Sequence, residues 1–421
     1  MGIKIGYACL TLGVPDTGMK TCRQDKAGDE RLKELIGSNL MSLERIIDYN
    51  IEMGIQMFRI SSDLIPFGSS PVNTLPWWEI FADDFQRIGK KIAGASMRVS
   101  MHPGQYTVLN SEDPGVVERA VLDLEYHNRV LDCLVTGKEH KIILHVGGVY
   151  GDRLEAKKRF VRTVSSLDPA ILSRLVIEND DRSYPIDQVL DLAGQVGVPV
   201  VFDNLHHQVL PPATERKESE WIALAGETWK SRDGSQKIHY SQQDPGKRPG
   251  SHSTSINLDD FSTFFYGLEG QKPDIMLEVK DKNLSAVKCI NGIRNPGTIK
   301  NLEEEWSRYK YSLLESSPLG YQSIRNLLKD KSAYPVLEFY RILDMGLKEV
   351  ITVGNSINAL HHVWGYFKEK ASDKEKKKFL AMVEKLEKEG GSPTSIKRFL
   401  YRLALDYDQD YLKNSYFLLI P

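Results

Sequence analysis

Six short apolar runs of the sequence end in a histidine or a carboxylate. The run "LVIEND" (175–180), for example, places Glu178 near its end and follows it with Asn179 and Asp180. Charged side chains that converge on one rim repel one another and are costly to bury without partners, and divalent cations remove both difficulties. The six residues are His102, His145, Glu178, Asp203, His239 and Glu278, and two further histidines, His206 and His252, follow in adjoining loops.

Imidazole and carboxylate groups without thiolates form a ligand set that suits Mn²⁺ or Zn²⁺ better than Mg²⁺ or Ca²⁺. Eight ligands exceed what one ion needs, so the sequence predicts two or three ions, with Mn²⁺ favoured and Zn²⁺ or Mg²⁺ as alternatives. Multi-metal sites typically activate a water and clamp the oxygens of an in-line displacement at phosphorus. Glu178 is predicted to bridge two ions, whereas Asn179 and Asp180 either orient ligands or only form a turn.

Eight short β-rich runs, separated by segments of helical length, must position these residues. Strands that are apolar nearly throughout and alternate with helices predict a closed parallel (β/α)8 TIM barrel, with a doubly wound sheet as the second option. Active sites of such barrels lie at the C-terminal ends of the strands, where Tyr7 and Arg59 stand in the first two runs. The runs lie at 3–8, 56–61, 97–102, 141–146, 175–180, 198–204, 236–241 and 274–280, with helices expected between them over 41–54 and 115–135.

Charge, cysteine usage and hydropathy exclude several classes of protein. The 421 residues carry a net charge of −2, which predicts no strong nonspecific affinity for nucleic acid, so any DNA binding must rely on local basic patches. The four cysteines include no CxxC pair, which argues against a zinc finger or a disulfide framework and fits a reducing cytoplasm. No apolar run is long enough to span a membrane, and the first residues lack a signal-peptide layout. A cytoplasmic protein without a membrane partner is therefore expected.

A series of motifs resembles, in order and spacing, the UV damage endonucleases of the UvdE type over roughly residues 1–295. The resemblance implies a barrel related to endonuclease IV, and an enzyme that nicks DNA immediately 5′ to UV photoproducts and some other lesions. It also implies damaged double-stranded DNA as the partner. The motifs are MHPGQYTVLN (101–110), LHVGG (144–148), IENDD (177–181), FDNLHH (202–207), KIHYS (237–241), SH (251–252) and LEVKDK (277–282).

The same resemblance implies roles for the individual ligands. Glu178 lies between the first two ions, and Glu178, Lys237 and His239 are implied to be catalytic. The implied ligands are His102 and His145 for the first ion, Asp203, His239 and Glu278 for the second, and His206 and His252 for the third.

Lys237 matches a lysine that the family places beside the metals. Residues 237 and 239 of one strand point to the same side, so a protonated Lys237 would lie beside cations and be disfavoured. Its amine is therefore neutral, or modified to an anionic form such as a carbamate, or turned away toward an acidic side chain.

Several residues near the strand ends are implied to contact DNA. The pair Gln105–Tyr106 matches residues with which the family probes the lesion, since an aromatic ring and an amide can fill the gap left by damaged bases. Tyr7 is a second lesion-contacting candidate, with a hydrogen-bonded core tyrosine as the alternative. Lys247 and Arg248 lie in a loop rich in Pro and Gly that can contact phosphates.

One position departs from the family pattern, because some relatives carry a histidine where Ser70 stands. Ser70 is not among the eight predicted ligands, so the metal cluster is unaffected. The departure puts in doubt the positioning of the phosphate and the action on strongly distorted lesions.

After a linker at 292–300, amphipathic stretches rich in Lys, Glu, Leu and Tyr predict a separate all-α domain over 296–421. Helices are expected over 373–389 and 392–407. The segment is similar to a helical domain of unknown function found on its own in other bacteria. Its basic residues, among them Lys397 and Arg398, either follow a DNA backbone or form a solvated charged face, so its partner is DNA, a protein or neither.

The leading hypothesis is a monomeric, metal-dependent DNA repair endonuclease that acts at UV photoproducts and also at abasic sites. The alternatives are an AP endonuclease of the endonuclease IV type, a metal-dependent sugar isomerase or epimerase on the same barrel, and a noncatalytic DNA-binding protein. A sugar isomerase needs only one or two metals and a deep closed pocket. The large ligand set and the Gln-Tyr loop therefore favour the nuclease.

Overall fold

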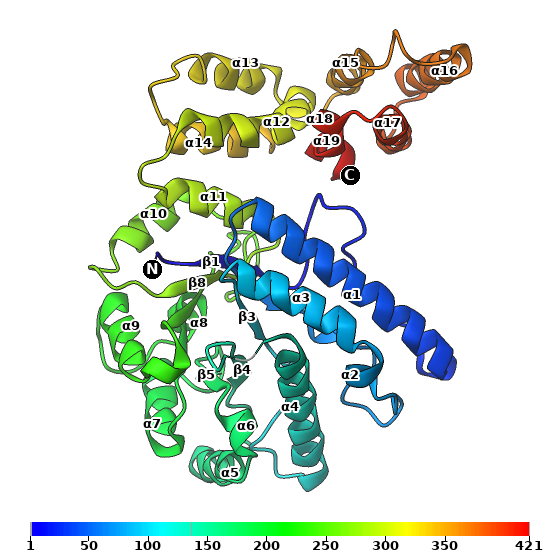
Figure 1. The fold of residues 1–421 in the computed structure, drawn as a ribbon. Coiled ribbons are helices and arrows are strands. Elements are labelled where there is room, and N and C mark those ends of the chain that lie inside the picture. The colour runs from blue at the N-terminus through cyan, green and yellow to red at the C-terminus, as the bar shows by residue number, and fades with distance from the viewer. Residues whose placement is uncertain (1, 136, 421) are drawn as a thin grey trace. The chain divides into compact units, whose positions relative to one another are not determined.

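The computed structural model describes residues 2–135 and 137–420 (Figure 1). These residues form two compact units, the first made of residues 2–11 and 16–287 and the second of residues 12–15 and 288–420. Residues 288–295, which the sequence analysis placed with the barrel, therefore belong by their contacts to the second unit. No helix within the described residues is long and apolar enough to cross a membrane.

The first unit is a closed barrel of eight parallel strands that pair in sequence order, which confirms the predicted (β/α)8 fold. Each strand is short and lies inside one of the predicted runs. The pairing places His145 opposite Glu178 and Asp203 opposite His239, so the strand ends meet at one rim. The strands are β1 (Ile5–Ala8), β2 (Met57–Ile60), β3 (Arg98–Met101), β4 (Ile142–His145), β5 (Leu175–Glu178), β6 (Val200–Asp203), β7 (Lys237–Tyr240) and β8 (Asp274–Leu277).

Helices surround the strands (Figure 1). The predicted helix over 115–135 is α4, which starts with Pro114 after the N-cap Asp113, whose carboxylate accepts from the N–H of Gly115. The helix expected over 41–54 begins earlier, at Asp29, because an apolar face already recurs from there. The longer helices of this unit are α1 (Asp29–Glu52), α3 (Ala82–Gly94), α4 (Pro114–Leu134), α5 (Arg153–Ser165), α7 (Ile186–Val196), α9 (Glu218–Glu227) and α10 (Leu258–Tyr266), and the shorter ones are α2 (Trp77–Ile80), α6 (Pro169–Leu172) and α8 (Asn204–Val209). The helix α11 (Asn283–Ile293) begins in this unit and ends in the second.

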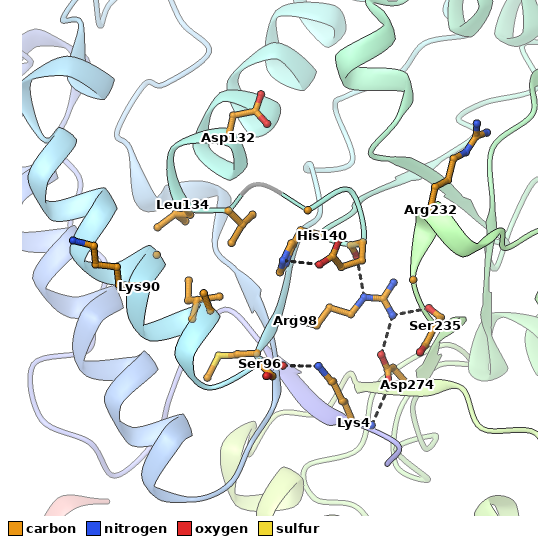
Figure 2. A pocket seen from close by; sticks show the side chains of 18 of the residues that line it. Lys4, Lys90, Ser96, Arg98, Asp132, Leu134, His140, Arg232, Ser235 and Asp274 are labelled. Carbon is orange, nitrogen blue, oxygen red and sulfur yellow. Dashed lines mark hydrogen bonds and ion pairs between the residues drawn. The ribbon is translucent and has the colours of Figure 1, made fainter. Parts of the chain in front are cut away.

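The N-terminal end of the barrel is held by a buried ion pair. Arg98 begins β3 and Asp274 begins β8, and Arg98 Nη1 lies 2.9 Å from Asp274 Oδ2. Arg98 also donates to the carbonyls of Glu139 and Ser235, and Asp274 accepts from the backbone N–H of Lys4 (Figure 2). These groups line a cavity of about 780 Å³. Because they are engaged with one another, this end of the barrel serves stability, and the chemistry belongs to the opposite end.

The second unit is helical, which confirms the predicted all-α region. The helix predicted over 373–389 is α16, capped by Ser372 and Glu375 bonding to each other's backbone N–H groups. Both alternatives for Lys397, contact with a DNA backbone and a place on a solvated charged face, are wrong, since Lys397 is buried and its Nζ lies 2.6 Å from Glu315 Oε2. The helices are α12 (Ile299–Ser316), α13 (Pro318–Leu327), α14 (Val336–Gly346), α15 (Val353–Trp364), α16 (Asp373–Glu389), α17 (Thr394–Asp406), α18 (Asp410–Lys413) and α19 (Tyr416–Leu419).

Candidate metal centre

Glu178, at the end of β5, is the centre of a buried cluster at the C-terminal rim of the barrel. Its Oε1 lies 2.8 Å from His239 Nδ1 and 3.7 Å from His206 Nδ1. Its Oε2 lies 3.2 Å from His102 Nε2 and 3.9 Å from His145 Nε2. One carboxylate therefore contacts imidazoles from four different elements or loops, as expected of a ligand that bridges two ions.

The remaining three predicted ligands join the same cluster. Asp203 Oδ1 lies 3.7 Å from His206 Nδ1. Glu278, which follows β8, lies 3.3 Å from His239 Nδ1 through Oε1, and its Oε2 lies 3.8 Å from His252 Nε2. All eight residues that the sequence singled out are thus linked by contacts of less than 4 Å.

The buried groups of this cluster shift one another's pKa values. Burial raises the pKa of Asp203, and the neighbouring Glu178 and Glu278 raise it further. Although burial opposes them, the three carboxylates raise the pKa of His206 to about 9. Burial lowers the pKa of His102 to about 4. Three carboxylates buried this close together disfavour one another's charged forms, and divalent cations would relieve that repulsion.

Backbone carbonyls fix the orientation of two of the imidazoles. His102 Nδ1 lies 3.0 Å from the carbonyl oxygen of Pro103, and His206 Nδ1 lies 2.9 Å from that of Asn179. A proton on each Nδ1 satisfies these contacts and leaves Nε2 free as a ligand atom. This arrangement is the usual one for histidines that bind metals.

The donor atoms fit divalent cations. Ligand atoms of His102, His145 and Glu178 lie within 4.8 Å of one another, and so do those of Glu178, Asp203 and His239. Asp203 Oδ2 is buried without a hydrogen-bond partner among the described residues, which is costly unless a cation binds it. Imidazole nitrogens and carboxylate oxygens together suit Mn²⁺ or Zn²⁺.

Lys237 lies inside the barrel, on the same side of β7 as His239. Its Nζ donates to Ser100 Oγ at 2.7 Å, so it is turned neither to an aspartate nor to a glutamate. Burial holds the pKa of Lys237 well below its ordinary value, and the guanidinium groups of Arg98 and Arg59 add to this effect. Of the three states considered from the sequence, the neutral amine agrees best with these surroundings, and the carbamate stays a prediction.

Four of the predicted DNA-contacting residues are exposed in loops at the C-terminal rim. Gln105 and Tyr106 lie in the loop after β3, and the side chain of Tyr106 is 85% exposed. Lys247 and Arg248 are exposed in the loop that carries His252, which is tied back by a bridge to Gln243.

The prediction that Tyr7 contacts the lesion is wrong for this structure, and the alternative of a core tyrosine holds. Tyr7 is fully buried, and its hydroxyl lies 2.7 Å from Thr11 Oγ1 and 2.8 Å from Asn50 Oδ1 of α1. The reason is the alternation of side chains along β1. Ala8 packs into the barrel interior against Met57, so Tyr7 must point outward, toward α1.

Comparison with known proteins agrees with this geometry. The model of the family described as UV-endonuclease UvdE matches residues 3–309. The chain belongs to this family. A second family, described as a protein of unknown function (DUF1722), matches residues 310–421. The resemblances inferred from the motifs and from the C-terminal helices are therefore confirmed.

Individual relatives are named UV DNA damage endonuclease. A UV DNA damage endonuclease of Clostridium perfringens (strain 13 / Type A) is 37% identical over 397 residues, which are 92% of this chain and 93% of that protein. One of Halalkalibacterium halodurans is 30% identical over 306 residues, covering 70% of this chain and 94% of that protein. The crystal structure of SacUVDE covers 72% of this chain and 99% of its own, with 36% identity and a TM-score of 0.64.

Arg59 belongs to the site although the sequence analysis gave it no role. Its side chain is the last one on β2 that points into the barrel, and its Nη1 contacts Glu278 Oε1. Although burial opposes them, Glu278 and neighbouring groups raise the pKa of Arg59, which stays charged. Its place at a strand end was the available signal. Ser70, by contrast, is half-buried in the loop after β2, where its Oγ accepts from the N–H of Val72.

Proposed function

We propose that this chain is a metal-dependent endodeoxyribonuclease that nicks damaged double-stranded DNA immediately 5′ to UV photoproducts, and also at abasic sites. Two or three ions, with Mn²⁺ favoured, complete the centre around Glu178. The observation that carries the proposal is the convergence of eight imidazole and carboxylate side chains beside an exposed Gln-Tyr loop, in a chain of the UvdE family.

Different side chains of the centre would have different roles in such a reaction. Bound divalent ions supply a water of lowered pKa and positive charge for the phosphate oxygens. Glu178 and His239 are both buried and lie 2.8 Å apart, so two of the side chains that would hold the ions are already close together. His102 and His206 keep their protons on Nδ1 through backbone carbonyls. The products would be a 3′-hydroxyl and a 5′-phosphate.

The exposed loops account for recognition of the lesion. Stacked bases would have no place for the ring of Tyr106, whereas a photoproduct that leaves the stack opens a gap for it. Gln105 is beside it with an amide that can bond to unpaired base edges. Lys247 and Arg248 supply the local positive charge that a chain of net charge −2 otherwise lacks.

The decisive experiment is nicking of an end-labelled duplex that contains one cyclobutane thymine dimer, with Mn²⁺ added, compared between the unsubstituted chain and Glu178→Ala. A metal-dependent cut immediately 5′ to the dimer, absent in the variant, supports the proposal. If Mn²⁺ binds but dimer, 6-4 photoproduct and abasic duplexes all stay intact, the nuclease proposal fails and sugar substrates are the next to test.

A further inference from the structure

Two asparagines each follow a carboxylate of the centre directly and bond to the next strand of the barrel. Asn179 follows Glu178, and its Nδ2 donates to the carbonyl of Asp203 at 3.0 Å while its Oδ1 accepts from the N–H of Asp203 at 2.9 Å. Asn204 follows Asp203 and bonds in the same reciprocal way to Ser241, at 3.0 Å and 2.7 Å. Both side chains are buried.

These amides continue the barrel where its backbone pairing ends. The β5–β6 pairing reaches Glu178 opposite Val201, and the β6–β7 pairing reaches Asp203 opposite His239. A side-chain amide presents one donor and one acceptor edge, as a peptide group does. Each asparagine therefore supplies one more rung of the ladder, at the level of the ligands.

The hydrogen bonds continue from the end of β7 to the end of β8, which is followed by the ligand Glu278. Ser241 Oγ donates to the carbonyl of Glu278 at 3.2 Å. In addition, the carbonyl of Asn179 accepts from His206 Nδ1. One continuous series of hydrogen bonds thus joins the ends of β5, β6, β7 and β8, and it passes through the backbones of Asp203 and Glu278.

We propose that Asn179, Asn204 and Ser241 form a positioning relay that sets the spacing of the ligands on these four strands. None of the three is assigned as a ligand; they act through the backbone of the residues that bear the ligand atoms. The inference rests on the proposed metal centre. Groups that orient metal ligands typically change metal affinity or activity about 10–100-fold when removed.

Asn39 provides a matched control, because it makes the same reciprocal bonds away from the centre. It is fully buried on α1, its Oδ1 accepts from the N–H of Lys20 at 2.7 Å, and its Nδ2 donates to the carbonyl of Lys20 at 2.9 Å. Its Nδ2 also donates to the carbonyls of Asp63 and Leu64, so Asn39→Ala should cost at least as much stability without disturbing the ligands.

The test measures binding of Mn²⁺ alone to the full chain, by titration and by the electron paramagnetic resonance signal of the free ion. It also records the visible spectrum of the Co²⁺-loaded chain, which reports the ligand geometry. We expect Asn179→Ala and Asn204→Ala to weaken Mn²⁺ binding about 10-fold or more and to shift the Co²⁺ bands, with Asn39→Ala unchanged in both. Where an alanine variant does not fold, Asn179→Asp or Asn204→Asp, which keeps the acceptor but loses the donor, is measured in its place.

Two results would overturn the relay in distinguishable ways. If the unsubstituted chain binds Mn²⁺ tightly and the variants match it in affinity and spectrum, the relay is refuted and the proposed function stands. If the unsubstituted chain binds neither ion, the metal centre itself is refuted and the relay with it.

Discussion

Replacing Tyr106 with alanine should impair action on damaged DNA without affecting the fold. Its side chain is 85% exposed, so truncation removes no core packing, and exposed sites usually change stability by less than about 0.5 kcal/mol. Stacking of an aromatic ring on a base contributes about 1–3 kcal/mol. If that contact forms only when damaged bases leave the stack, its loss should lower kcat/KM on a dimer duplex by about 5- to 150-fold.

The assay is nicking of a duplex with one thymine dimer, under single-turnover conditions, with saturating Mn²⁺. Tyr266 offers a matched control, since it is 72% exposed and ends α10, at the opposite end of the barrel from the metal centre. Tyr266→Ala should nick as the unsubstituted chain does. Tyr106→Phe keeps the ring and should retain most of the activity, because stacking needs the ring and not the hydroxyl.

The reasoning is refuted if Tyr106→Ala nicks the dimer duplex at the unsubstituted rate while its Mn²⁺ affinity and melting temperature are unchanged. An equal loss in Tyr106→Phe would instead assign the effect to the hydroxyl, and stacking would not be the cause.

Three further outcomes follow from the described contacts. Asp274→Asn leaves Arg98 buried without its counter-ion and should cost about 3–5 kcal/mol of unfolding free energy, measured with denaturant; a cost below about 1 kcal/mol would contradict a buried pair. Burial raises the pKa of Glu305 to about 7, so the folded chain holds a proton that the unfolded chain releases near pH 4.5. As the pH rises from 4.5 to about 7, the free energy of unfolding should fall by at most about 3 kcal/mol. Glu305→Gln should abolish that fall, as thermal melts across this pH range would show. Mn²⁺ at about 100 times its Kd should add about 2.7 kcal/mol of stability, which chelation reverses; an equal gain in Glu178→Ala would place the ion elsewhere.

Much of the barrel could be predicted because its signals are local. Every strand lies inside a run that the hydrophobic pattern marked, and the helices at 115–135 and 373–389 appear almost as expected. Parallel strands in a closed barrel bring their C-terminal ends to one rim, so residue types at those ends already define a cluster. The pairing of His145 with Glu178 across β4 and β5 agrees with the ion that the family resemblance implied for both.

The errors arose where side-chain direction or long-range contact decides. Tyr7 was assigned to the mouth of the barrel, but the inward positions of β1 belong to its neighbours, and Asn50 on α1 holds its hydroxyl. Lys397 was one of the basic residues considered for DNA binding, but Glu315, far away in the sequence, pairs with it inside the second unit. A single sequence shows residue type and period, and it does not show which distant group completes a hydrogen bond.

By itself the sequence determined the fold class, the family and the identity of the eight candidate ligands. The hydrophobic pattern of each strand and the residue type at its end depend only on neighbouring positions in the chain. Only the tertiary structure decided how those ligands are held. It placed Lys237 against Ser100 and linked Asn179 and Asn204 to the following strands. Each of these contacts joins residues that lie on, or directly after, different strands, and their distance depends on the register and closure of the barrel as a whole.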